Sequence, residues 1–97
     1  MAFKAGSTIA LCGAFYQGDI QIADLSAYTV RCKLSTIERR LLQTLDDRVS
    51  IAQDGSVCAI LDPEDTATLR GRILYTFSLS LEENVICEIT KDFDIYE

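Results

Sequence analysis

The sequence predicts an all-β fold in which two antiparallel sheets pack into a sandwich, with one short helix near residues 63–69. Three observations lead to this prediction. In several segments apolar residues recur with a period of two, which places successive side chains on opposite faces of a strand. Polar turn residues separate about seven such segments at intervals of roughly eight to twelve residues, and only one segment has the residues that begin a helix. This spacing of short strands is typical of an immunoglobulin-like β-sandwich.

The first half of the chain contains three expected strands. Residues 8–15 form an apolar run with small side chains, Gly18-Asp19 follows as a turn, and residues 20–22 suit a short strand. Residues 28–34 alternate more clearly between apolar and polar side chains, as a half-buried strand requires. The side chains expected to face the core are Tyr28, Val30, Cys32 and Leu34.

The longest alternating run covers residues 73–81. Its expected inward side chains are Ile73, Tyr75, Phe77, Leu79 and Leu81, and its opposite face carries Thr76, Ser78 and Ser80. We expect a three-residue loop, Glu82-Glu83-Asn84, to join this run to residues 85–90 in a β-hairpin. Residues 93–96 either extend the second strand or bend away from it.

A second hairpin is predicted around Asp54-Gly55, a dipeptide that suits the positive backbone angles of tight turns. Its strands are residues 49–52 and 57–61. Residues 35–40 are ambiguous between a helical turn and a loop that leads into a strand.

The helix signal lies immediately after the second hairpin. Asp62 can cap a first turn begun by Pro63, and Glu64 and Asp65 suit the positive end of the helix dipole. Because Gly71 ends the segment, we expect one to two turns that stop at residue 69 or 70.

Composition and charge limit the partners. The 97 residues are 48% apolar, so we expect a single domain over 1–97 with disorder only at its ends. The net charge of −6 repels nucleic-acid phosphates, and the basic cluster at residues 38–40 is expected to be a solvated loop. No apolar stretch approaches the roughly 20 residues that cross a bilayer, and no secretory signal follows the first residues. We therefore expect no nucleic acid and no membrane partner, and a chain that is made and kept in the cytoplasm.

The four cysteines are expected to be free, buried thiols. No pair has Cys-x-x-Cys spacing, which excludes a zinc site by local spacing but not one assembled across the fold. Two disulfides are possible in three connectivities, yet a chain without a secretory signal matures where thiols stay reduced. The residues concerned are Cys12, Cys32, Cys58 and Cys87.

Catalytic chemistry finds little support in the sequence. Histidine is absent, which removes the usual general base and the commonest transition-metal ligand. The candidate carboxylate pairs are Glu64 with Asp65 and Asp92 with Asp94, and we expect Asp92 and Asp94 to be solvated on the outer face of a strand. Neither Asp46-Asp47 nor Asp54-Gly55 has the spacing of a calcium loop. We predict no catalytic residue, no cofactor and no metal site, and hence a protein that is not an enzyme.

Three segments resemble a group of bacteriophage structural domains. Residues 18–34 are similar to that family's Asp-Leu-Thr-Gly-Tyr-Thr-Val entry into a strand, and residues 57–69 to its strand that ends in a Pro-Glu-Asp-Thr helix. Residues 71–79 are similar to the strand that follows, with 85–95 as the closing hairpin arm. The family is the immunoglobulin-like domain of phage baseplate upper proteins and of small prophage tail or virion proteins. Two positions depart from its pattern: Ala27 replaces a glycine, and Thr76 stands where an acid is common.

The resemblance implies an assembly role rather than catalysis. It predicts a phage or prophage structural protein, oligomeric, that binds copies of itself or another virion protein and is located in the virion. A bacterial adaptor unrelated to phage is the alternative, and a carboxylate-based ligand-binding or hydrolytic sandwich is a third hypothesis. The partner-binding residues stay unknown, although Tyr16 and Tyr96, at turn and terminal positions, are candidate contact anchors.

Overall fold

The computed structural model describes residues 2–97, which form ten strands and two single-turn helices. The helices are the 3₁₀ turn η1 (Asp46–Arg48) and α1 (Pro63–Thr66). The strands are β1 (Ala2–Lys4), β2 (Ile9–Gly13), β3 (Tyr16–Gln17), β4 (Ile20–Gln21), β5 (Thr29–Thr36), β6 (Leu41–Thr44), β7 (Val49–Ile51), β8 (Val57–Leu61), β9 (Gly71–Leu81) and β10 (Asn84–Tyr96). There are more strands than the predicted seven because β1, β3 and β6 were not predicted, and β1 and β3 are too short to show alternation.

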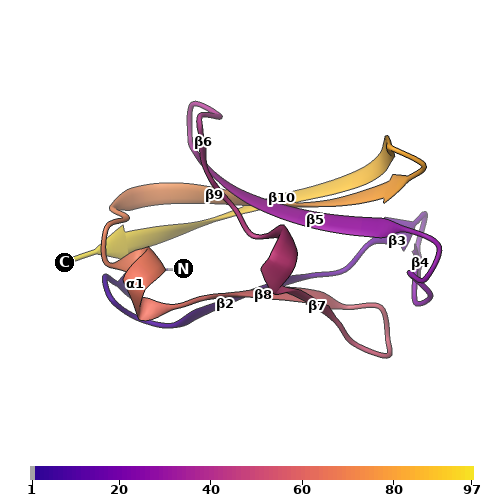
Figure 1. Cartoon of the computed structure of the whole chain (residues 1–97), viewed down its shortest axis with the longest axis horizontal. Helices are drawn as coiled ribbons and strands as arrows, with labels where there is room; N and C mark the ends of the chain where they lie inside the picture. The colour runs from indigo at the N-terminus through magenta and orange to yellow at the C-terminus, as the bar shows by residue number, and fades with distance from the viewer. Residues whose placement is uncertain (1) are drawn as a thin grey trace.

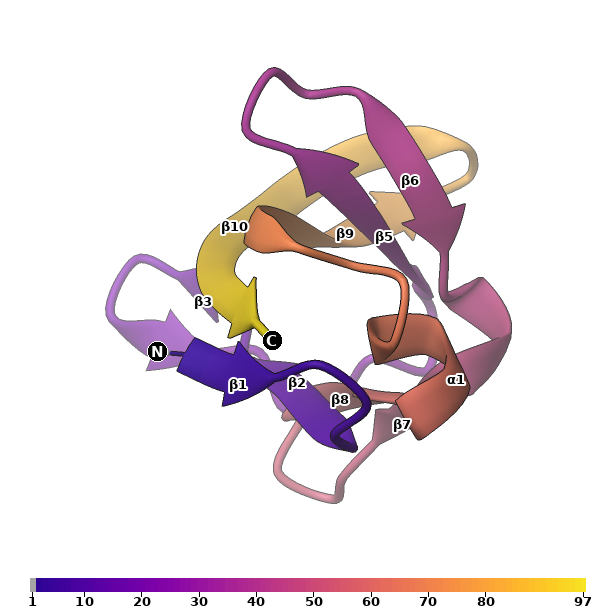
Figure 2. The ribbon, with the colours of Figure 1, turned by 90° about the vertical axis from the view of Figure 1, so that its left-hand side faces the viewer.

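Two sheets pack face to face, as Figures 1 and 2 show. In the described residues one sheet has five strands in the order β1-β10-β9-β5-β6, and the other has three in the order β2-β8-β7. All pairings are antiparallel except that of β1 with β10. β3 and β4 form a separate two-stranded ribbon. The division of the strands between the sheets matches that of the immunoglobulin fold, with β2, β8 and β7 in one sheet and β10, β9, β5 and β6 in the other. The predicted all-β sandwich is therefore confirmed.

The core lies between the two sheets and follows the predicted alternation. In β5 the side chains of Cys32 and Leu34 are buried while Arg31 and Lys33 are exposed. The buried apolar side chains form one cluster, to which both sheets contribute. Its members are Ile9, Leu11, Phe15, Leu25, Cys32, Leu34, Leu45, Val57, Ala59, Leu61, Ile73, Phe77, Leu79, Phe93 and Ile95.

Strand β9 differs from its prediction in two ways. Thr76 and Ser80 were expected on a solvated face, but they are only 3% and 7% exposed. β9 is flanked by β5 and β10, so side chains of both neighbours cover these short residues. Leu81, expected in the core, is exposed because it lies at the hairpin end of the strand.

The β9–β10 hairpin is tighter than predicted. Asn84 pairs with Leu81, so the loop consists of Glu82 and Glu83 alone. Both have positive φ, 50° and 73°, as the two central residues of a type I′ turn require. The predicted three-residue loop is therefore wrong, although the hairpin itself is confirmed.

Helix α1 is confirmed but ends at Thr66, earlier than predicted. Its capping box joins Asp62 and Asp65, and the buried Thr66 hydroxyl donates to the carbonyl oxygen of Ser7 at 2.7 Å. The ambiguous residues 35–40 prove to be a strand end and a loop, since β5 continues to Thr36 and a turn leads to β6.

The hairpin of β7 and β8 is confirmed, with β7 ending at Ile51 instead of residue 52. Gly55 has φ +89° and lies against another part of the chain. A Cβ atom there would overlap the carbonyl oxygen of Ile22 and lie 2.7 Å from the Cα of Ala23. Glycine therefore serves both the turn and the close approach of the two segments.

A comparison of two glycines tests this contact. Gly6 has a similar φ of +83°, but a Cβ atom there meets nothing within 4 Å. Gly55→Ala and Gly6→Ala should share the backbone strain, about 1 kcal/mol. Only Gly55→Ala adds an overlap with backbone, so it should lower the free energy of unfolding in urea by at least about 1 kcal/mol more. Equal losses would show that the 22–23 segment moves away freely.

Candidate functional site

The two carboxylates of the candidate pair Glu64 and Asp65 lie in different surroundings. Glu64 is exposed, whereas the Asp65 side chain is only 14% exposed and lies at a junction of several elements. Asp65 forms an ion pair with Arg48 and accepts hydrogen bonds from the Asp62 amide at 2.9 Å and from Gln43 Nε2 at 3.3 Å. The hydrogen bond from Arg48 is the main reason that the pKa of Asp65 is lowered. Asp65 thus stays ionised and joins α1, η1 and β6.

The other acidic candidates are also separated or engaged. Asp92 is exposed on β10, and Asp94 accepts from Arg72 Nε at 3.3 Å. Asp46 accepts from the amide of Cys32 at 2.9 Å, which fixes η1 to β5. Asp54 accepts from the Ser56 amide in the β7–β8 turn, and this hydrogen bond lowers its pKa. Within residues 2–97, no three His, Cys, Asp or Glu residues cluster as metal ligands.

Two of the cysteines are joined, which corrects the prediction that all four are free. Cys12 of β2 and Cys58 of β8 are directly opposite in the three-stranded sheet, with Cα atoms 4.1 Å apart, and form a disulfide. They lie on the outer face of that sheet and not in the core. Cys32 is free and buried, and Cys87 is free and half-buried. No local pattern marks this disulfide, because it depends on the pairing register of two strands far apart in sequence.

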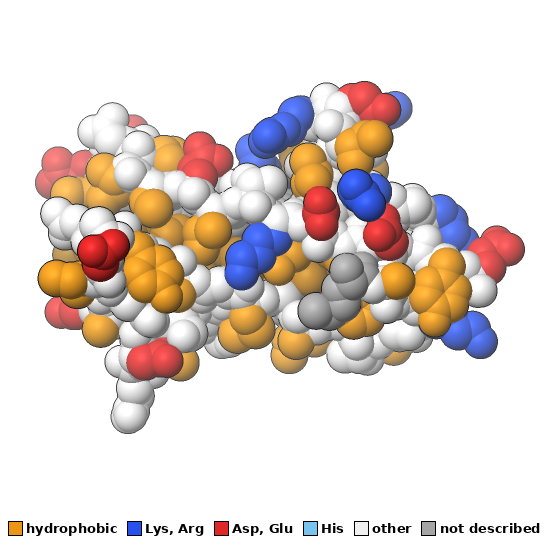
Figure 3. Space-filling view, turned by 180° about the vertical axis from the view of Figure 1, so that it is seen from behind, with side chains coloured by type: hydrophobic (Ala, Val, Ile, Leu, Met, Phe, Trp, Pro, Cys, Tyr) orange, Lys and Arg blue, Asp and Glu red, His pale blue; other side chains and the backbone are white. Residues whose placement is uncertain are grey.

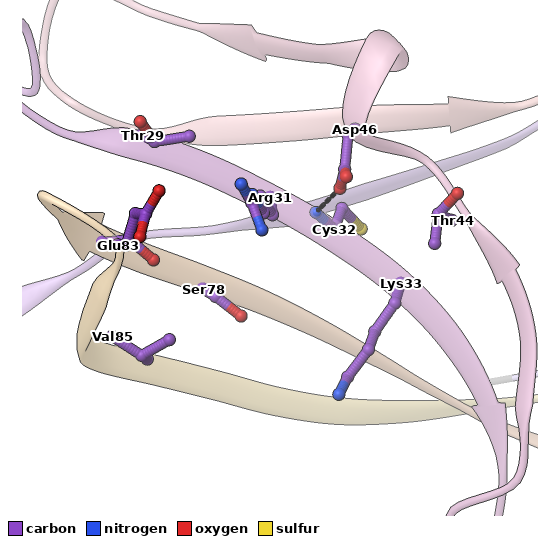
Figure 4. A pocket seen from close by; sticks show the side chains of 10 residues that line it. Thr29, Arg31, Cys32, Lys33, Thr44, Asp46, Ser78, Glu83 and Val85 are labelled. Carbon is purple, nitrogen blue, oxygen red and sulfur yellow. Dashed lines mark hydrogen bonds between the residues drawn. The ribbon is translucent and has the colours of Figure 1, made fainter.

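An open groove crosses the outer face of the five-stranded sheet. It has a volume of about 550 Å³ and runs between β5 and the β9–β10 hairpin. Figure 4 shows Arg31 and Lys33 projecting from β5, Glu83 and Val85 at the hairpin end, and Ser78 between them. Hydroxyl groups and charges of both signs line the groove, so it suits polar and charged groups of a partner. The sequence prediction identified none of these residues as a site, because the strands that carry them are far apart in sequence.

The candidate anchors Tyr16 and Tyr96 are both exposed but are not brought together. Tyr16 lies in β3 and Tyr96 at the end of β10, at opposite ends of the long axis (Figure 1). Figure 1 places β3 and the β9–β10 hairpin at the same end of the long axis, but Figure 2 shows β3 and this hairpin on opposite sides of the molecule. The hairpin has three exposed large apolar side chains of its own, Leu81, Val85 and Ile86. We call these three residues the apolar end.

The same region contains an open sheet edge. β1 pairs with β10 only at residues 94–96, so in the described chain residues 84–93 of β10 have a strand neighbour on one side alone. Such an edge presents unpaired backbone N–H and C=O groups. Figure 3 shows apolar and acidic side chains together at the hairpin end of the molecule, on its left in that view.

Comparison with known proteins gives no further indication of the site. No model of a known protein family matches the chain, and no curated protein or solved structure is detectably similar to it. Among residues 2–97, no helix has the length and apolar character needed to cross a membrane.

The structural role of Asp65 can be tested by comparison with Asp94, which also pairs with an arginine but has a side chain that is 43% exposed. Asp65→Asn should lower the free energy of unfolding by about 1–3 kcal/mol, and Asp94→Asn by less than about 1 kcal/mol. Because the folded-state pKa of Asp65 is depressed, its contribution is present above the unfolded pKa of about 3.9 and is lost as pH falls through the folded value. The Asp65→Asn deficit, measured by urea unfolding, should therefore shrink below about pH 4. A constant deficit would contradict the assignment.

The cysteines differ in expected reactivity. Burial, with a smaller effect of Asp46, raises the pKa of the Cys32 thiol to about 12, so almost no thiolate forms near neutral pH. Iodoacetamide at about pH 8 should label Cys87 in the folded protein and leave Cys32 unlabelled until the protein is unfolded. Cys12 and Cys58 should become reactive only after reduction. Peptide mass spectrometry measures all four, and rapid labelling of Cys32 in the folded state would contradict its burial.

Proposed function

We propose that this protein is a non-enzymatic structural or assembly protein of a phage or prophage, a tail, baseplate or other virion component. It acts through contacts with copies of itself or with another structural protein of the particle. The observation that carries the proposal is the coincidence of the apolar end with the unpaired edge of β10.

The apolar end favours burial in a complex. Ile86 is 55% exposed, and its neighbours at this end are also large apolar side chains with substantial exposure. Contiguous exposed apolar side chains typically mark protein–protein contact sites, because removing them from water is favourable by roughly 25 cal/mol per Å². Val85 and Ile86 belong to the first residues of the open β10 edge, so a partner can gain apolar contacts and backbone hydrogen bonds together.

The acidic side chains support a role that does not depend on catalysis. Asp46 and Asp54 accept hydrogen bonds from backbone amides, and Asp65 forms an ion pair with Arg48. These interactions stabilise a turn and the contacts between neighbouring helices and strands. The assignment to phage rests on the three resembling segments. In the fold they correspond to β4 with β5, β8 with α1, and β9, so they cover strands of both sheets.

The test is whether this chain is part of a particle. Particles from an induced producing culture are purified by sedimentation and density gradient, and the chain is quantified by peptide mass spectrometry. We expect a fixed ratio to the major structural proteins. Absence from the particles, together with a stable complex in the cytoplasm of cells that make none, would contradict the proposal and favour a bacterial adaptor.

Matched variants connect incorporation to the apolar end. Ile86→Asp should reduce incorporation at least about tenfold, since a charge at a buried contact is costly. Ile60→Asp makes the same change at a side chain that is 50% exposed on the outer face of β8 in the other sheet, and it should be incorporated normally. Equal incorporation of both variants would exclude the apolar end as the contact.

A further inference from the structure

The outer face of the five-stranded sheet is ordered in rows that cross three strands. In one row Arg31 of β5 is opposite Ser78 of β9, which is opposite Glu88 of β10. The next row contains Lys33, Thr76 and Thr90. β5 therefore contributes cations, β10 contributes acids, and β9 between them contributes short hydroxyl side chains.

The charges on this face have no ion-pair partners among residues 2–97. Arg31, Lys33, Glu88 and Asp92 are exposed, and none of them forms an ion pair with another described residue. Two strand spacings of about 4.8 Å place the backbones of Arg31 and Glu88 about 10 Å apart. The charges of β5 and β10 therefore remain available to a second molecule.

This arrangement is self-complementary about an axis parallel to β9. A two-fold rotation about an axis above β9 places β10 of one copy over β5 of the other, at the same level along the strands. Arg31 of each copy then faces Glu88 of the other, and Lys33 lies between the levels of Glu88 and Asp92 of the other copy. In an isologous interface of this kind every contact occurs twice.

The side chains near the two-fold axis can face their own copies without repulsion. A side chain on the axis meets its own copy, so a charge there would face a like charge. Ser78 of β9 is partly exposed, uncharged and short, which permits close approach, whereas Thr76 and Ser80 are already covered by the neighbouring strands. Arg72, further along β9, is already paired with Asp94 of its own chain.

We propose that two copies of this chain associate face to face through the outer face of the five-stranded sheet, with Arg31 of each copy paired to Glu88 of the other. The proposal rests on the proposed assembly function and names the partner for one surface. The groove beside Arg31 would receive the β10 side chains of the second copy.

The charged character of the interface determines how it should respond to salt. Ion pairs at a solvent-accessible interface are screened, since the Debye length falls from about 10 Å at 0.1 M salt to about 3 Å at 1 M. Sedimentation equilibrium of the purified chain over a wide concentration range should show a monomer–dimer equilibrium. Its dissociation constant should rise at least about tenfold between 0.1 M and 1 M salt.

Charge exchange gives the decisive test. Arg31→Glu and Glu88→Arg should each raise the dissociation constant at least about tenfold, because each places like charges opposite one another twice per dimer. The double variant Arg31→Glu with Glu88→Arg should restore the dimer, since it reverses both members of the pair. Glu64→Arg makes the same charge change as Glu88→Arg at an exposed position on α1, off this face, and it should leave the dimer intact.

Circular dichroism of each variant confirms that it is folded. A wild-type chain that stays monomeric at low salt overturns the proposal, as does a dimer unaffected by the single exchanges or not restored by the double one. A monomer that is nevertheless built into particles overturns the dimer and leaves the proposed function standing. If the dimer is salt-sensitive and responds to the charge exchanges as expected, but the chain is absent from particles, the proposed dimer is supported and the proposed function is overturned.

Discussion

The rest of the structure depends on the pairing of β9 with a strand on each side. β9 is the middle strand of the five-stranded sheet, and its register with β5 and β10 decides which side chains enter the core. A slip of one residue would exchange Phe77 and Leu79 for Thr76 and Ser78. Because burying each large apolar side chain contributes roughly 1.5–3 kcal/mol, such a slip is strongly disfavoured.

The same register also defines the outer surface. Alternation that places apolar residues inward necessarily places Arg31, Ser78 and Glu88 outward in one row. The positions of the side chains on the proposed dimer face therefore follow from the packing of the core. Only the residue types at those positions can change without disturbing the core. The open edge of β10 differs from this face, because it has a bulge between Val85 and Cys87. A bulge limits indiscriminate strand pairing at the edge, so contacts through side chains and through the edge can be controlled separately.

Polar side chains connect the two short helices to the strands around them. Asp65 connects α1 to η1 and β6, Asp46 connects η1 to β5, and Thr66 connects α1 to the segment before β2. Every buried side-chain nitrogen or oxygen of residues 2–97 has a hydrogen-bond partner. Of the acidic residues considered as catalytic candidates in the sequence, Asp65 thus has a structural task.

The sequence by itself determined the class of fold, most strands, both hairpins and the start of the helix, because alternation, Asp54-Gly55 and Asp62-Pro63 act over a few neighbouring residues. Only the tertiary structure decided the properties that depend on which strands meet. The Cys12–Cys58 disulfide, the burial of Thr76 and the two-residue loop at Glu82 all follow from register between strands. The row that joins Arg31 to Glu88 likewise unites positions far apart in the chain. A local pattern contains no information on such pairings, since they are set by the packing of one complete core.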